Sequence, residues 1–181
     1  RDCLDGSGST ELEGKIFHRE EILDTVQKEI FLFLSRLVSG QVPHDVTHQA
    51  NIQMRLADEY ESLSDYIVNV LKAVKKMEQT GLKLDEPALE KLLTLHDRVA
   101  AYIVKVDAYV KDGNAELLTW ATAEGTAIAK LMKEIRAKHL TRLQNEEVSP
   151  YFSLAYTDML NYYRRMKDHA LNIAEVIAGE K

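Results

Sequence analysis

The stretch ESLSDYIVNV, residues 61–70, shares one helical pattern with RRMKDHALNI, residues 164–173. Both carry Asp at the fifth place and Asn at the ninth, with their apolar residues in the same phase. The two Asp positions, 65 and 168, differ by 103 residues. The segments before them also correspond, since Lys-Glu-Ile at 28–30 matches Lys-Glu-Ile at 133–135. A repeat of this size predicts two similar helical units side by side, around a pseudo-twofold axis.

Outward from this repeat, apolar residues recur at steps of three and four, the spacing of an amphipathic helix. The pattern predicts five long helices, at about 15–39, 44–79, 85–111, 114–145 and 150–177. In the first of them the apolar stripe is Ile22, Val26, Ile30, Phe33 and Leu37.

Breaks in the pattern separate these segments: Gly40 with Pro43, Gly81, Asp112-Gly113 and Ser149-Pro150. No segment alternates with a period of two. We therefore predict an all-α fold, an extended antiparallel bundle of five long helices. Residues 1–14 are rich in Gly and Ser and lack periodicity, so we expect a flexible lead-in there.

Composition limits the function. The chain has 181 residues, of which 45% are hydrophobic, so it can bury a core. A formal net charge of −6 argues against nucleic acid as a partner. The single Cys3 excludes an internal disulfide and is typical of a reducing compartment. No apolar run reaches the roughly 18 residues that a transmembrane helix needs, and no signal-peptide pattern is present, so we expect a soluble chain.

Acidic side chains mark the candidate site. Glu20 and Asp24 are four residues apart, as are Glu61 and Asp65, so each pair lies on one helix face. Facing one another, the two helices would gather four carboxylates, with Asp58 one turn further along. Clustered like charges repel, and a multivalent cation relieves that repulsion. Oxygen ligands suit Fe, Mn, Mg or Ca, with Zn also open. The alternative is a solvated acidic face, which is common on long helices.

The repeat resembles a known family. ESLSDYIVNV and the tail KDHALNIAE, residues 167–175, are similar to the signature of PhoU-type phosphate-uptake regulators, whose three-helix unit carries an ExxxD motif. The likeness covers most of residues 15–181. A similar domain forms the cytoplasmic C-terminal part of bacterial sodium/phosphate cotransporters, in which the second motif is commonly eroded. Arg164 likewise stands here in place of the Glu.

The resemblance implies a domain organisation and a function. Residues 15–81 would be a first PhoU-like repeat of two helices, lacking one helix, and residues 82–181 a second repeat of three. We expect a non-catalytic regulatory or interaction domain linked to phosphate transport, the cytoplasmic tail of a sodium-dependent transporter at the inner face of the cell membrane. Its partners would be the transporter's membrane domain or another phosphate-transport protein. A homodimer is a further candidate.

The resemblance also implies iron or zinc in the first repeat, held by Glu20, Asp24, Glu61 and Asp65, with Asp58 and Asp168 as additional candidates. In the second repeat we expect no metal. Gly125 and Ala129 replace the upstream acids, and Arg164 is placed to form an i,i+4 ion pair with Asp168.

Two other classes of function remain open. A ferritin-like, carboxylate-bridged metalloprotein needs Glu-x-x-His pairs, and the sequence has none. An ion-free helical adaptor is the other alternative. There is no nucleophile–base arrangement and no phosphate-cradling Gly-rich loop, so we expect no enzyme. His44 and His48 have a spacing used by zinc sites but lack a third ligand, and His169 is more typical of a core edge than of a ligand.

Overall fold

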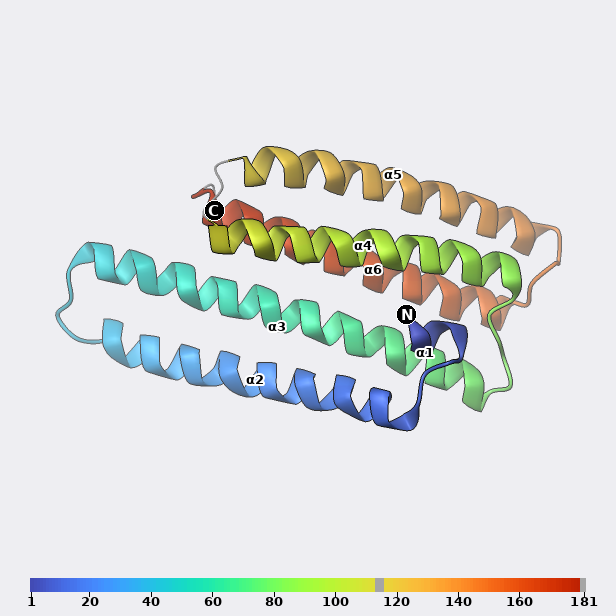
Figure 1. Ribbon diagram of the computed structural model, residues 1–181, viewed down its shortest axis with the longest axis horizontal. Coiled ribbons are helices and arrows are strands. Elements are labelled where there is room, and N and C mark those ends of the chain that lie inside the picture. The colour runs from blue at the N-terminus through green and yellow to red at the C-terminus, as the bar shows by residue number, and fades with distance from the viewer. Residues whose placement is uncertain (113–115, 180–181) are drawn as a thin grey trace.

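The computed structural model describes residues 1–112 and 116–179, and within them it is helical, with no strand. Six helices follow in the order α1 (Asp2–Asp5), α2 (Thr10–Val38), α3 (His44–Gln79), α4 (Glu86–Asp112), α5 (Leu117–Gln144) and α6 (Pro150–Ile177) (Figure 1). The all-α prediction and the helical bundle are confirmed. Of the predicted boundary residues, Gly113 and Asn114 lie outside the described part of the chain.

The five predicted long helices are present as α2 to α6, and a short sixth helix lies within the first fourteen residues. Residues Asp2–Asp5 form α1, which ends at Gly6 with φ of 80°, a conformation that glycine adopts without strain. Leu4 of this turn is buried in the core. The Ser9 side chain then accepts a hydrogen bond from the backbone N–H of Leu12 at 3.2 Å. This N-cap starts α2 at Thr10, five residues before the predicted start.

The five long helices form two groups. α4, α5 and α6 pack against one another, whereas α2 packs along α3, and α3 joins the groups by packing against α6 (Figure 1). Where α4, α5 and α6 meet, the contact residues are buried. One core contains Leu92, Val99 and Tyr102 of α4, Ile128 of α5 and Met159 of α6. The core of the molecule therefore lies among α3 to α6.

α2 is the exception, because none of its residues is buried. The stripe predicted from its sequence is helical, but the structure leaves it uncovered: Ile22 is 47% exposed, Val26 45%, Phe33 67% and Leu37 39%. α2 meets α3 along a neighbouring face instead, which includes Phe17, Glu20, Asp24 and Leu34, all half-buried. The acidic pair of α2 consequently lies on the α2–α3 seam.

Candidate functional site

The predicted acids of the first half lie along the seam between α2 and α3. Glu20 and Asp24 of α2 and Glu61 and Asp65 of α3 are all half-buried, whereas Asp58 is exposed. Burial raises the pKa of Glu61, and the negative charges of Asp65, Asp58 and Asp24 raise it further. Acids from both helices therefore share one electrostatic environment, as predicted from the two i,i+4 pairs.

Lys28 belongs to the same cluster. Its Nζ lies 2.7 Å from Asp24 Oδ2 in an i,i+4 ion pair. That hydrogen bond and the charge of Asp24 raise the pKa of Lys28, and the charges of Glu61 and Glu20 add to the effect. On the neighbouring turn, the Gln27 side-chain amide donates to Asp58 Oδ1 at 3.5 Å. Lys28 thus supplies a positive charge where the sequence predicted a metal ion.

The donor set fits a cation in charge and in chemistry, since it consists of crowded carboxylates that repel one another. The arrangement of the side chains fits less well. Among the described residues, no three His, Cys, Asp or Glu side chains converge in a way that could hold a metal ion. Binding at Asp24 would also require Lys28 to move away from it.

In the second half, the residues at the positions that the proposed repeat matches to Glu20 and Asp24 have different surroundings. Gly125 is buried, and a Cβ added there would lie 3.4 Å from Tyr102 Oη and 3.7 Å from Lys167 Cδ. The Tyr102 hydroxyl donates to the Ala121 carbonyl at 3.0 Å, which fixes the ring in this place. A tyrosine and a lysine stem therefore occupy the space beside Gly125, and an acid would meet both.

The predicted ion pair of the second motif is confirmed. Arg164 Nη1 lies 3.7 Å from Asp168 Oδ2, and Lys167 also forms an ion pair with Asp168. Asp168, an additional candidate ligand, is thus engaged by two cations of its own helix.

Sequence reasoning missed a buried carboxylate between α3 and α6. Glu59, 8% exposed, accepts hydrogen bonds from His169 Nδ1 at 2.7 Å and from the Asn172 amide at 3.0 Å. The Tyr66 ring stacks on the His169 ring with centroids 5.5 Å apart. The signal was present, because Glu59 falls three residues after Leu56 and four before Leu63, in the buried phase of the helix. This network ties the two helical groups together.

A second missed pair lies between α5 and α6. His139 Nε2 and Ser153 Oγ are 2.8 Å apart, and both residues are buried. Burial lowers the pKa of His139, with a smaller effect from the charge of Arg142. Phe152 and Tyr156 cover the imidazole, the Tyr156 ring centroid lying 4.6 Å away. The pair therefore lies inside the packing between α5 and α6, away from the surface.

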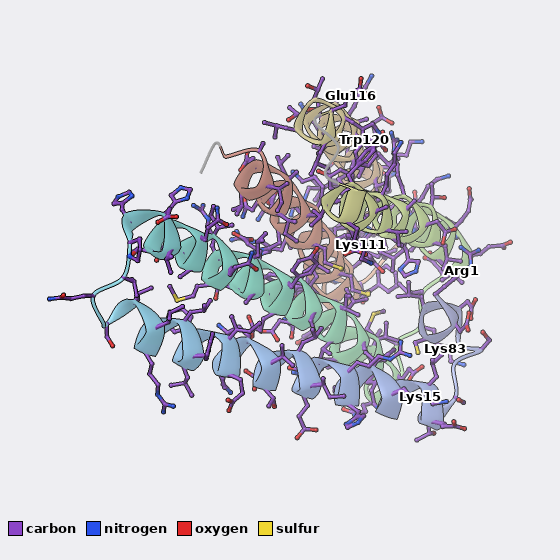
Figure 2. All side chains as sticks on the ribbon, turned by 60° about the vertical axis from the view of Figure 1, so that its left-hand side comes forward. Arg1, Lys15, Lys83, Lys111, Glu116 and Trp120 are labelled. Carbon is purple, nitrogen blue, oxygen red and sulfur yellow. The ribbon has the colours of Figure 1, made fainter. Side chains whose placement is uncertain are left out.

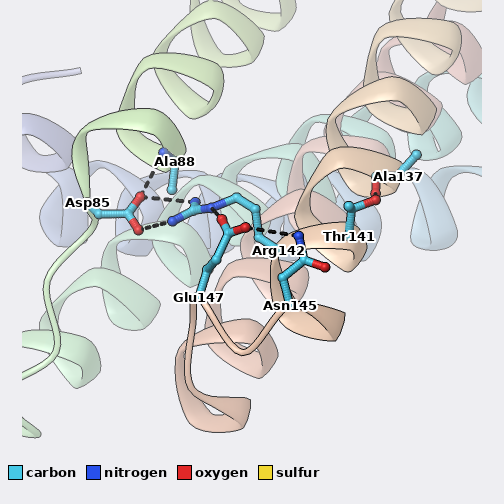
Figure 3. Close-up of polar contacts among 7 residues, drawn as sticks. All are labelled: Asp85, Ala88, Ala137, Thr141, Arg142, Asn145 and Glu147. Carbon is cyan, nitrogen blue, oxygen red and sulfur yellow. Dashed lines mark hydrogen bonds and ion pairs between the residues drawn. The ribbon is translucent and has the colours of Figure 1, made fainter.

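Near the His139–Ser153 pair, an ion pair holds the C-terminal end of α5. Both Nη atoms of Arg142 donate to the Asp85 carboxylate, which precedes α4, and Arg142 Nε lies 3.5 Å from Glu147 (Figure 3). Asp85 also caps α4 by accepting from the Ala88 N–H at 3.0 Å. The Arg142 hydrogen bond is the main cause of the lowered pKa of Asp85.

His44 and His48, which have a spacing used by zinc sites, lie exposed in the first turns of α3.

A groove of about 700 Å³ runs between the end of α3 and the start of α6. Its lining is mostly apolar, including Tyr151 and Leu154, and it carries the amines of Lys72 and Lys76. Neither the repeat nor any motif predicted it, because it forms only where two helices distant in sequence meet.

No described helix combines the length and the hydropathy that a membrane span requires. Comparison of the chain with protein-family models, with curated proteins and with solved structures gives no match in any of the three.

Proposed function

We propose that this chain is a non-catalytic regulatory or interaction domain linked to phosphate transport. In this proposal the chain is an antiparallel helical bundle of two PhoU-like repeats, the first lacking one helix. In this proposal it acts as the cytoplasmic tail of a sodium-dependent phosphate transporter and controls phosphate flux through contacts with the membrane domain or with another phosphate-transport protein. Iron or zinc would be held in the first repeat by Glu20, Asp24, Glu61 and Asp65.

One observation carries the proposal, namely the difference between the two equivalent seams. In the first half, carboxylates of α2 and α3 share one half-buried environment in which the pKa of Glu61 is raised. In the second half, Gly125 is packed against Tyr102 and Lys167. A purely structural repeat has no need for repelling acids on one of its seams, because such charges oppose packing. Their presence supports a cation-dependent role for the first half alone.

The metal part of the proposal is tested by elemental analysis of the purified protein. We expect iron or zinc in the natural sequence and its loss in the double variant Glu61→Ala/Asp65→Ala. The matched control is Glu11→Ala/Glu29→Ala, which removes two exposed acids of α2 and should leave the metal content unchanged. Equal metal content in all three proteins would contradict the assignment of these ligands.

The transport part is tested by uptake of ³²P-labelled phosphate in bacterial cells that produce the chain. We expect uptake to differ from that of cells carrying an empty vector, and the Glu61→Ala/Asp65→Ala variant to return it toward the empty-vector rate. Identical uptake in all three strains, at equal protein levels, would contradict the link to phosphate transport.

An ion-free helical adaptor is the second candidate, and Lys28 favours it. Its ammonium already pairs with Asp24 and lies near Glu20 and Glu61, so the chain partly neutralises its own cluster. The variant Lys28→Gln separates the two candidates. If a metal ion competes with this ammonium, the variant binds added Mn²⁺ or Zn²⁺ more tightly than the natural sequence, whereas an adaptor binds neither ion.

A further inference from the structure

The most exposed apolar surface of the molecule lies on one helix. Seven of the large hydrophobic side chains that the described residues leave exposed belong to α2, and the other helices contribute far fewer each. α2 forms one edge of the molecule, and among the described helices its main packing partner is α3 (Figure 1). In Figure 2, seen from a second direction, α2 again lies at the edge, with side chains projecting away from α3.

Five of these side chains form a continuous stripe, which we call the α2 face: Ile22, Leu23, Val26, Phe33 and Leu37. Together with the half-buried Ile30, they recur at the three- and four-residue steps of a helix that packs against another helix. This is the strongest amphipathic signal of α2. The contact with α3 does not use it, because that contact runs along the acidic side of the helix.

The proposed repeat matches α2 with α5, and in α5 the corresponding helix is packed on two sides. α5, the counterpart of α2, packs against both α4 and α6, and its residues Leu117, Ala121, Ile128 and Ile135 are buried. α2 has a partner corresponding to α6, namely α3, but none of the described helices packs on it as α4 packs on α5. The α2 face is thus a helix-packing surface that lacks its second helix.

We infer that the α2 face is a homodimer interface, in which α2 of one copy packs antiparallel against α2 of a second copy. The two α2–α3 hairpins then form a four-helix bundle at the twofold axis. This arrangement is independent of phosphate transport and of any bound metal.

The order of residues in the stripe favours a second copy as the occupant. The pair Ile22 and Leu37 and the pair Val26 and Phe33 are both centred on the bond between Glu29 and Ile30. Reversing the helix about that point therefore places Leu37 against Ile22 and Phe33 against Val26. A twofold interface requires such self-complementarity, because the same patch must fit itself.

The area also suits a dimer. With the exposed fractions given above and roughly 150–200 Å² for a fully exposed large apolar side chain, the α2 face presents about 400 Å² of apolar surface. Homodimer interfaces are about 65% apolar. The whole contact would then bury about 600–700 Å² per copy, near the lower end of stable interfaces. We therefore expect a reversible dimer of micromolar affinity.

A membrane surface is a less suitable occupant. Helices that lie on membranes carry a polar face rich in Lys and Arg. Near the α2 face, basic and acidic residues are mixed, since Glu21 and Glu29 lie between Arg19 and Arg36 along the helix. The formal net charge of the chain is −6, which opposes approach to anionic lipid.

Sedimentation velocity over about 1–100 µM protein tests the inference. We expect a monomer–dimer equilibrium for the natural sequence and a monomer for Phe33→Lys at every concentration. Because Phe33 is 67% exposed, the variant should keep its helical circular dichroism and its melting temperature as a monomer. The control Val104→Lys changes an equally exposed residue of α4 and should remain a dimer. A natural sequence that stays monomeric at about 100 µM, or a Phe33→Lys variant that still dimerises, overturns the inference.

Disulfide trapping tests the direction of pairing, in a background with Cys3→Ser. Residues 26 and 33 are seven apart on one helix, about 10 Å, too far for a disulfide, which needs Cα atoms within about 7 Å. Antiparallel pairing predicts cross-linked dimers from the double variant Val26→Cys/Phe33→Cys and none from either single variant. Cross-linking of both single variants shows parallel pairing, and cross-linking of none of the three shows that α2 is not the interface. Either result overturns the inference.

Discussion

Removal of the buried carboxylate between α3 and α6 should destabilise the whole bundle. Glu59 accepts hydrogen bonds from His169 and Asn172, and the substitution Glu59→Ala leaves both donors at a seam from which water is largely excluded. The side chains of Glu59 and His169 are 11% and 21% exposed, so solvent screens the pair only in part. This seam also joins the two helical groups, and its loss therefore affects the whole molecule.

The expected magnitude follows from the contacts. A hydrogen bond to a charged group contributes about 1.5–3 kcal/mol, and removing one partner of a buried pair costs about 3–5 kcal/mol. Because the donors here are partly exposed, we expect Glu59→Ala to lower the free energy of unfolding by about 3 kcal/mol. For a chain of this size that corresponds to a melting temperature lower by about 6–12 °C. Glu59→Gln keeps an acceptor oxygen but loses the charge, and should cost about half as much.

Urea unfolding followed by circular dichroism measures both variants, with His169→Ala and the double variant Glu59→Ala/His169→Ala completing a thermodynamic cycle. We expect a coupling free energy of at least about 1 kcal/mol between the two residues. Asp58→Ala is the matched control, an exposed acid on the adjacent position, and should change stability by less than about 0.5 kcal/mol. A loss below about 1 kcal/mol for Glu59→Ala, or additive single variants, would refute the reasoning.

Three further predictions concern the two seams and the buried histidine. Glu61→Gln should raise the melting temperature at pH 7 in metal-free buffer, because it removes one of several repelling charges. The gain should vanish as the pH falls through the raised pKa of Glu61, where the natural side chain becomes neutral as well. Gly125→Leu should lower the free energy of unfolding by about 1–3 kcal/mol in urea, since its side chain would collide with Tyr102 and Lys167. Burial lowers the pKa of His139 in the folded chain. Below about pH 6.5, His139 is therefore protonated in the unfolded chain but stays neutral in the folded chain. The free energy of unfolding should then fall by up to about 1.4 kcal/mol per pH unit.

Each of these three predictions has an outcome that would contradict it. A Glu61→Gln variant that melts lower than the natural sequence at pH 7 would show that the acid makes a favourable contact. A Gly125→Leu variant as stable as the natural sequence would mean that the packing beside Gly125 can accommodate a larger side chain. For His139, the variant His139→Gln should show a weaker loss of stability between pH 7 and pH 5.5, and an unchanged pH profile would assign that loss to other groups.

Much of the secondary structure could be predicted from the sequence, because it depends on local periodicity and on caps. The spacing of the apolar residues indicates the five long helices, and Gly, Pro, Asp and Ser residues indicate the breaks between them. The short helix α1 at the amino terminus was not predicted, because Gly and Ser suggested an irregular segment there. There Leu4 is buried by contact with residues distant in sequence, and such a contact has no local signal.

The candidate site stays a prediction, and the structure adds how its residues are arranged. Helical spacing placed Glu61 and Asp65 on one face, and the structure brings acids of α2 and α3 into one environment. Spacing allowed Lys28 to pair with Asp24, four residues before it, but only the structure shows that Lys28 also lies near Glu61 of α3. The role of Gly125 was equally hidden, since only packing places Tyr102 beside it.

Local spacing was enough to predict that the chain is helical, where its long helices run, and that acids stand at 20, 24, 61 and 65 while Gly125, Ala129 and Arg164 stand at the positions matched to them. These features follow from interactions among residues a few positions apart. The tertiary structure decided which face of each helix is covered. It turned the side of α2 that carries Glu20 and Asp24 toward α3 and left the apolar stripe at the surface, because α2 packs chiefly on one described helix, and one neighbour covers only one face of a helix.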